Sequence, residues 1–316
     1  MRQILVIRYG GFGDMILSMG AFRTIRAHHA VDRIAALTTS RFADLLRHSG
    51  YFDEVLLDER LRPWQIGGWL ALARVLRGKH FDRIYDLQRN ERTTILYRVI
   101  SFGRHLEWSG VIPGCSHYVR DDPDDRRHIA DRVAEQLAVA GIPETKPADL
   151  GWLTGDIGHF DLPPSYALLV PGGAPHRPEK RAPAEAFAGL GRHLMGQGIA
   201  PVLLGTDSER DQIDAIAGAC PGAIDLSDRT SFGEIADLAR HATGAVGNDT
   251  GAMHLAAAVG CPSLVLFSAA SDPSRVRPLG RRVHVVETDT LRTLSIPALI
   301  AAWEELRRPL GSAMDR

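Results

Sequence analysis

Short apolar runs alternate with longer stretches of helical periodicity along this chain, and the series starts twice. Such alternation is typical of parallel sheets covered by helices. The first series begins at Ile4 to Ile7 and the second at Tyr166 to Val170. Between them, residues 151–164 are rich in Gly, Pro and Asp and follow neither period, so we place a domain boundary there. The sequence predicts two doubly wound α/β domains, residues 1–155 and 156–316.

Both series can be followed element by element. Further strands are expected at residues 33–38, 54–57, 83–87, 201–204, 223–226, 244–247 and 263–267. Helices are expected at residues 14–28, 70–76, 128–140, 184–195, 209–218, 232–240, 251–259 and 297–308. The last helix has no strand after it, so it could pack on either domain. Because ligands of open parallel sheets bind beyond the carboxyl ends of the strands, we expect a binding cleft between the domains.

The composition narrows the class of protein. The formal net charge is −1, so no overall basic field favours nucleic acid or an anionic membrane. Three distant cysteines, Cys115, Cys220 and Cys261, indicate neither a disulfide framework nor a zinc site. No apolar run is long enough for a signal peptide or a membrane helix. We expect a soluble cytoplasmic protein that needs no cofactor.

Two loops of the second half suit a phosphate. In the run Val246 to His254 a strand leads through Asn248 and Asp249 into a helix at Gly251, and free amides at a helix start attract anions. An ordinary capped helix would give the same pattern. The run Leu168 to Arg181 is a Gly/Pro loop with basic residues that either clamp a diphosphate or face water.

Carboxylates follow two other strands. Glu209 either accepts hydrogen bonds from ribose hydroxyls or complements the dipole of its own helix. Asp14 ends a glycine loop that fails as a dinucleotide fingerprint, because Ile16 stands where Gly or Ala is needed. It is either a helix N-cap or the general base for a hydroxyl. From local sequence alone, the structural role is favoured for both residues.

The acidic run Asp121 to Asp125 looks like a metal-binding pair, but it directly precedes a helix and no strand is expected to lead into it. Complementation of the helix dipole is therefore the expected role. The histidines show no zinc-like grouping, so no metal site is expected.

Several runs together resemble glycosyltransferase family 9, the ADP-heptose:lipopolysaccharide heptosyltransferases. They are Gly13-Asp14 before an apolar helix, Asp86-Leu-Gln88, Pro171-Gly-Gly173 with Glu179-Lys-Arg181, and Gly247 to His254 followed by Leu266-Phe267 and Ser271-Asp-Pro273. The resemblance implies a GT-B fold, in which two Rossmann-like doubly wound domains face a central cleft. It also implies an N-terminal acceptor domain, a C-terminal nucleotide-sugar domain, and inverting transfer of a heptose or related sugar.

The resemblance assigns roles to individual residues. Asp14 would be the catalytic base and Lys180 would act on the departing diphosphate. Donor binding would fall to Gly172, Gly173, Arg181, Glu209, Thr230, Asp249, Thr250, Gly251 and His254. Acceptor binding would fall to Gly13 and Gln88. Arg89 and Arg92, which follow Gln88 in the sequence, either meet anionic groups of the acceptor or begin a solvated helix. Thr230 stands where family members often place an apolar residue against adenine.

The resemblance implies an ADP-heptose-like donor and an anionic glycolipid acceptor of the lipopolysaccharide-core type, with peripheral contact at the inner membrane. Two alternatives stay open: a nucleotide-sugar epimerase of the same fold, and a non-catalytic nucleotide-sugar-binding protein. The presence of Asp14 argues against the second alternative.

Overall fold

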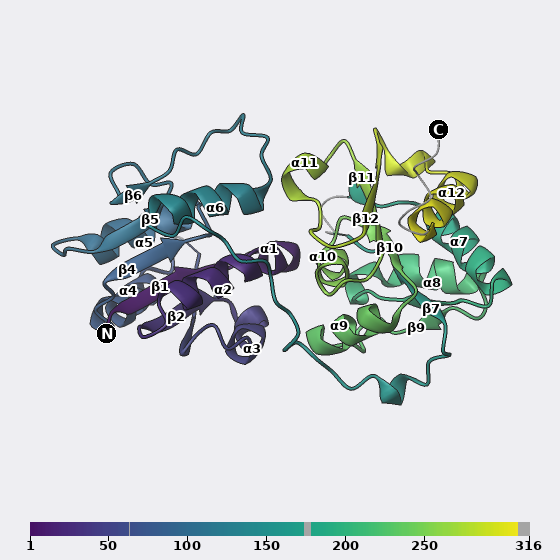
Figure 1. The fold of residues 1–316 in the computed structure, drawn as a ribbon, viewed down its shortest axis with the longest axis horizontal. Helices are drawn as coiled ribbons and strands as arrows, with labels where there is room; N and C mark the ends of the chain where they lie inside the picture. Colours follow the sequence, from purple (N-terminus) through teal and green to yellow (C-terminus); the bar gives the residue numbers. More distant parts are fainter. Residues whose placement is uncertain (63, 174–177, 309–316) are drawn as a thin grey trace. The chain divides into compact units, whose positions relative to one another are not determined.

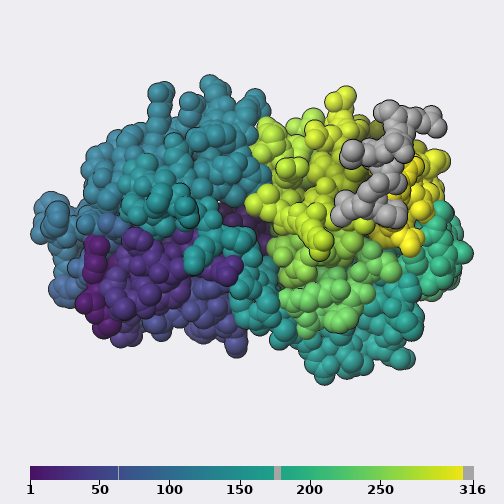
Figure 2. All heavy atoms as spheres, viewed as in Figure 1, coloured from purple at the N-terminus to yellow at the C-terminus, as the bar shows by residue number. Residues whose placement is uncertain are grey.

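The computed structural model describes residues 1–62, 64–173 and 178–308. The chain divides after Trp152 into two compact units (Figure 1). Figure 2 draws all atoms, with the first unit from purple to teal and the second from teal to yellow. No helix in the described part of the chain is long and apolar enough to span a membrane.

The first unit holds a six-stranded parallel sheet in the order β3-β2-β1-β4-β5-β6. Its strands are β1 Gln3–Ile7, β2 Arg33–Thr38, β3 Glu54–Leu57, β4 Arg83–Asp86, β5 Glu107–Gly110 and β6 His117–Tyr118. Its helices are α1 Phe12–Leu17, α2 Met19–His28, α3 Ser40–His48, α4 Ile66–Gly78, α5 Glu91–Ser101 and α6 Ile129–Val139.

The second unit holds another six-stranded parallel sheet, in the order β12-β11-β10-β7-β8-β9. Its strands are β7 Tyr166–Val170, β8 Ala200–Leu203, β9 Ile224–Asp225, β10 Ala245–Asn248, β11 Ser263–Ser268 and β12 Val283–Thr288. Its α-helices are α7 Ala184–Gly196, α8 Arg210–Ala219, α9 Phe232–His241, α10 Gly251–Ala258, α11 Pro273–Val276 and α12 Ile296–Arg307, and short 3-10 turns include η2 Pro178–Lys180 and η3 Asp207–Glu209. The predicted α/β class is confirmed.

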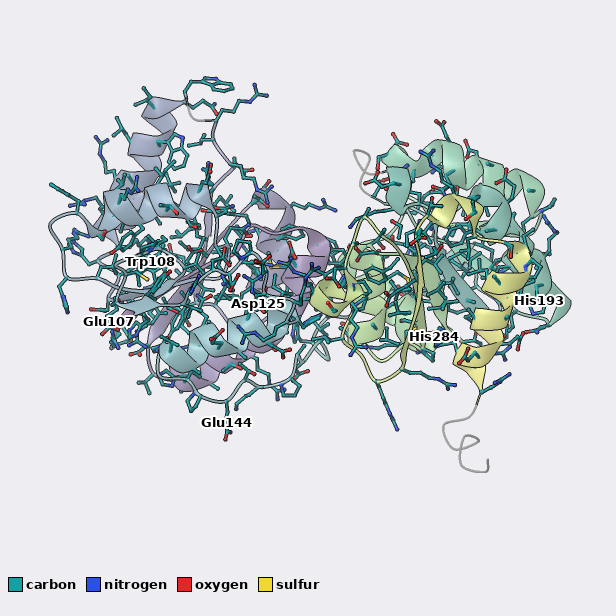
Figure 3. All side chains as sticks on the ribbon, turned by 90° about the horizontal axis from the view of Figure 1, so that it is seen from above. Glu107, Trp108, Asp125, Glu144, His193 and His284 are labelled. Carbon is teal, nitrogen blue, oxygen red and sulfur yellow. The ribbon has the colours of Figure 1, made fainter. Side chains whose placement is uncertain are left out.

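The sheet of the second unit is covered on both faces, and successive residues of a strand pack into the cores on opposite sides of it. In β7, Leu169 packs into one core cluster while Leu168 and Val170 pack into another, because successive strand residues point to opposite faces. Trp108 of β5 is fully buried in the interior of the first unit (Figure 3). The three cysteines are buried as well. Each unit therefore has its own core.

Several local expectations need correction. The helix expected at 14–28 is two helices that meet at Ser18, whose hydroxyl donates to the Asp14 carbonyl, a contact that bends helices. Strand β12 lacked a strong apolar run and was missed. Strand β6 does precede the acidic run at 121–125, although it is only two residues long. Helices α3, α5 and α11 and strand β5 were also missed.

The C-terminal helix α12 packs within the second unit, against α7, β11 and β12. Trp303 is its fully buried anchor. His193 of α7, labelled in Figure 3, lies 2.8 Å from Glu304 of this helix through Nε2 and Oε1.

The segment that enters the second unit passes directly over the start of α9. A Cβ on Gly233 would lie 2.1 Å from the Thr154 carbonyl oxygen, and one on Gly155 would lie 2.4 Å from the Glu234 nitrogen. Only glycine allows two backbones to approach this closely.

Gly233→Ala should therefore destabilise the protein by about 1–3 kcal/mol, because the methyl group has no space. Gly218→Ala is the matched control, since a Cβ there meets nothing within 4 Å in helix α8. That control should stabilise by about 0.5–1 kcal/mol, because alanine loses less backbone entropy in a helix. Thermal unfolding of both variants measures the contrast, and equal midpoints would contradict it.

Asp86 ends β4 as a fully buried carboxylate, and its Oδ1 accepts hydrogen bonds from the amides of Gln88 and Arg89. Burial raises the pKa of Asp86 to about 6, and these hydrogen bonds offset only part of that rise. The folded chain thus holds this proton more tightly than the unfolded chain does. Its contribution to the free energy of unfolding is present in full below the ordinary carboxyl pKa and is lost as the pH rises through about 6.

Asp86→Asn should remove this dependence, because the amide cannot ionise while its oxygen still accepts the two hydrogen bonds. The loss of thermal midpoint between about pH 4 and pH 7 should be smaller than in the parent protein. Asp44→Asn, at an exposed site on α3, is the control and should leave the pH slope unchanged. An unaltered slope in the Asp86 variant would disprove the assignment.

Candidate functional site

The loop after β7 is tied down by one buried side chain, Asn248 at the end of β10. Its Nδ2 donates to the carbonyls of Pro171 (2.6 Å) and Gly172 (3.0 Å), and its Oδ1 accepts from the Ala182 amide (3.1 Å). Asn248 is fully buried. It therefore holds both ends of the loop whose residues 174–177 lie outside the described part of the chain. The sequence suggested only a capping residue here, and nothing local signalled these distant partners.

Lys180 meets a buried carboxylate. Its Nζ lies 3.1 Å from Asp249 Oδ2, and both side chains are nearly buried. Ser271 donates to the same oxygen at 2.8 Å, and His254 Nε2 lies 3.5 Å from Asp249 Oδ1. Burial alone would raise the pKa of Asp249, but His254, Lys180 and Ser271 together lower it to about 2. The carboxylate is therefore ionised and fixed in place by three side chains.

Unsatisfied polar groups surround the start of α10, where Thr250 is the N-cap. Among the described residues, Thr250 Oγ1, His254 Nδ1, Arg181 Nε and Ser268 Oγ are buried and have no hydrogen-bond partner. Buried polar atoms normally have hydrogen-bond partners, so these unpaired atoms indicate that a polar ligand binds here. The amides at Thr250 and Gly251 belong to the first turn, where the helix dipole favours an anion.

Three other residues that are expected to bind the sugar donor are Glu209, Arg181 and Thr230. Glu209 Oε2 accepts from the amide and hydroxyl of Thr206, and the Glu209 side chain would lie 2.8 Å from a Cβ on Gly172. The structure therefore brings Glu209 against the Asn248-held loop, with one carboxylate oxygen already used in capping. Arg181 donates to the Gly173 carbonyl at 2.5 Å. Thr230 is half-buried just before Ser231, the N-cap of α9.

In the first unit, Asp14 lies at the third position of α1 rather than at the N-cap, which is Gly11. Its Oδ2 accepts from the Gly11 amide at 3.2 Å, and its side chain remains 43% exposed. The buried guanidinium of Arg8 lies 3.4 Å from Asp14 Oδ1 and donates to the Leu87 carbonyl at 2.5 Å. An accessible carboxylate thus stands over a buried cation, an arrangement that the sequence did not reveal.

Gln88 supports the same loop. Its Oε1 accepts from the amides of Tyr9 (2.8 Å) and Gly10 (3.0 Å), so it fixes the backbone that leads through Gly13 to Asp14. The structure therefore joins the end of β4 to the loop after β1.

The two predicted acceptor arginines have partners of their own. Arg92 forms a two-pronged ion pair with buried Asp58, donates to the Leu61 carbonyl and stacks 4.2 Å from the Trp69 ring centre. Arg89 lies 3.2 Å from Asp121. The contacts of Arg92 hold the loop after β3 against α5, so a structural role accounts for them.

The acidic run at 121–125 is also neutralised by arginines. Asp121 pairs with Arg89 and Arg132, and Asp125 pairs with Arg127 and Arg132. Hydrogen bonds from Arg127 lower the pKa of Asp125 to about 2. No group of three or more His, Cys, Asp or Glu in the described ranges could hold a metal ion.

Known proteins resemble this chain over most of its length. The family model described as glycosyltransferase family 9 (heptosyltransferase) matches residues 69–295. Lipooligosaccharide heptosyltransferase 2 of Haemophilus ducreyi is 32% identical over 314 residues, with 90% of this chain and 88% of that protein covered.

Two solved structures share the architecture. One is the Escherichia coli ADP-heptose lps heptosyltransferase II, with TM-score 0.76 and 22% identity over 97% of this chain and 98% of that one. The other is the E. coli heptosyltransferase WaaC with ADP, with TM-score 0.75 and 18% identity over 96% and 99%. They identify the fold as GT-B-like. The described sheets, the matched family model and the curated relative agree, and the chain belongs to glycosyltransferase family 9, the heptosyltransferases.

Proposed function

We propose that this glycosyltransferase moves a heptose or related sugar from an ADP-sugar to a lipopolysaccharide-core or similar glycolipid acceptor. The family membership and the relatives named above support the sugar and the acceptor, and the neighbour solved with ADP supports the base. The observation that carries the proposal is the buried Lys180–Asp249 pair beside the start of α10. The sugar transfer would take place in the cytoplasm, where the enzyme would meet its acceptor at the inner membrane.

The reaction is an inverting displacement at the anomeric carbon. The acceptor hydroxyl oxygen forms a bond to that carbon while its proton passes to Asp14. The bond to the diphosphate breaks, and the diphosphate leaves with the electron pair. Lys180, Arg181 and the amides at Thr250 and Gly251 stabilise the departing charge, so that no metal ion is needed for this role.

The position of Asp14 suits a base. Its carboxylate is accessible, whereas Gln88 and Arg8 hold the backbone around it. Because positioning is set before substrate binds, little reorganisation is needed during proton transfer. Gly13 and Gln88 would lie nearest to the acceptor, and Glu209, Thr230 and His254 would contact the nucleotide and sugar.

The nucleotide preference is the direct test. A thermal-shift panel of ADP, UDP and GDP should show the largest stabilisation with ADP, because ligand binding stabilises the folded state by mass action. A preference for UDP or GDP would show that the donor is not an ADP-sugar, but it would leave the proposed glycosyl transfer standing. Conversion of the nucleotide sugar without any acceptor would instead support the epimerase alternative.

Asp14→Asn should lower the turnover number by about 10²- to 10⁴-fold, because general-base catalysis is lost. ADP affinity, measured by calorimetry, should stay the same. The control Asp44→Asn, on the same unit, should retain full turnover. Parallel loss of turnover and ADP binding in the Asp14 variant would refute its assignment as the base.

Lys180→Met should weaken ADP binding about tenfold or more and slow transfer with it, because the diphosphate loses its buried cation and Asp249 is left less well paired. Lys146→Met, at an exposed site, is the matched control. Unchanged affinity for ADP in the Lys180 variant would show that Lys180 does not contribute to the donor site.

A further inference from the structure

The segment from Arg60 to Phe81 carries no Asp or Glu, but it carries four arginines and a lysine. It contains α4 and the turn before it. The chain as a whole is nearly neutral, with a formal net charge of −1, so this is a local excess of positive charge. Lys79 pairs with Glu54, so the excess rests on the arginines. Unpaired arginines in such a segment would attract an anionic surface even though the whole protein does not.

Helix α4 is apolar on both sides. On its inner side, Ala73 and Leu76 are buried, as the packing of the helix on the sheet requires. Its outer side carries Ile66 and Leu70, which are 66% and 62% exposed. Since these two residues are four positions apart, they lie on one face of the helix.

Helix α5 continues this surface. It contributes Leu96 and Ile100 to the same core cluster as Leu76 of α4, so both helices cover one face of the sheet and their outer sides point the same way. The two helices run side by side and parallel. Arg92 at the start of α5 stacks on Trp69 near the start of α4, and Arg77 at the end of α4 donates to carbonyls at the end of α5.

The outer sides of α4 and α5 (both labelled in Figure 1) thus form one exposed surface, which we call the α4–α5 face. Its exposed apolar residues are Trp64, Ile66, Leu70, Val75, Ile95, Val99 and Phe102. Scattered apolar residues on a surface are normal, but several exposed large apolar residues on two adjacent helices indicate an interaction site.

Arginines accompany the apolar side chains. Arg62, Arg74 and Arg98 are exposed, and none of them has a carboxylate within ion-pairing distance in the described part of the chain. Glu91 is the single acid within α5. The surface therefore combines aliphatic and aromatic side chains with unneutralised cations.

We propose that the α4–α5 face docks on a lipid bilayer that carries anionic headgroups. Helices that lie in the bilayer interface bury apolar side chains among the acyl chains and place arginine near the phosphates, with aromatic rings at headgroup depth. A second copy of the chain suits this face less well, because a symmetric contact would bring arginines against arginines. The purpose of docking rests on the proposed glycolipid acceptor, but docking itself does not.

Sedimentation of the full-length protein with vesicles tests this surface. The protein should pellet with phosphatidylglycerol/phosphatidylethanolamine vesicles and stay in solution with phosphatidylcholine vesicles. Arg74→Gln with Arg98→Gln should lower the partition coefficient about fivefold for each arginine removed. Ile66→Gln with Leu70→Gln should lower it about tenfold or more.

Val139→Gln, at a 48% exposed site on α6, and Arg281→Gln, at an exposed site of the second unit, are matched controls and should pellet like the parent protein. Thermal unfolding of every variant shows that it is folded. Three results would overturn the proposal: no pelleting, equal pelleting with both vesicle types, or a concentration-dependent dimer that the Ile66/Leu70 variant abolishes.

An assay with a short, water-soluble acceptor fragment separates docking from catalysis. The vesicle-binding variants should turn over this fragment at the parent rate, because none of the changed residues belongs to the proposed site. Vesicle binding without any transfer would reject the proposed function and leave the docking surface standing.

Discussion

In both sheets the strands run parallel, so their carboxyl ends all lie at the same side of the sheet. The loops that follow neighbouring strands therefore meet there, whatever their distance in the sequence. This constraint brings Gln88, after β4, to the loop after β1. It likewise brings Asn248, at the end of β10, to the loop after β7. The pairs are 79 and 77 residues apart in the chain. Without parallel pairing neither site would assemble.

Charge burial imposes a second constraint on the second unit. An ionised carboxylate in a buried site needs partners, and Asp249 obtains them from the loop before α7, from α10 and from the turn before α11. Lys180 is therefore held in a defined place before any nucleotide binds. The first unit reverses the arrangement, because there the cation Arg8 is buried and the carboxylate of Asp14 is accessible.

The sequence predicts what depends on local pattern. The strand at Tyr166 to Val170 and the helix start at Gly251 were found because apolar runs and capping residues are local signals. The partner of Arg92 could not be found, since Asp58 is 34 residues away and becomes a neighbour only through the fold. The same holds for the three hydrogen bonds of Asn248. Strand β12 was missed because its side chains are only half-buried, so its pattern is weak.

The buried thiols give each unit an internal chemical probe. Cys115 belongs to the first unit, while Cys220 and Cys261 belong to the second. Burial raises the pKa of all three thiols, that of Cys261 to about 12, so little reactive thiolate exists in the native state. A thiol-specific reagent therefore modifies a cysteine only when its surroundings open. Mass spectrometry of the labelled peptides would report the opening of the two units separately.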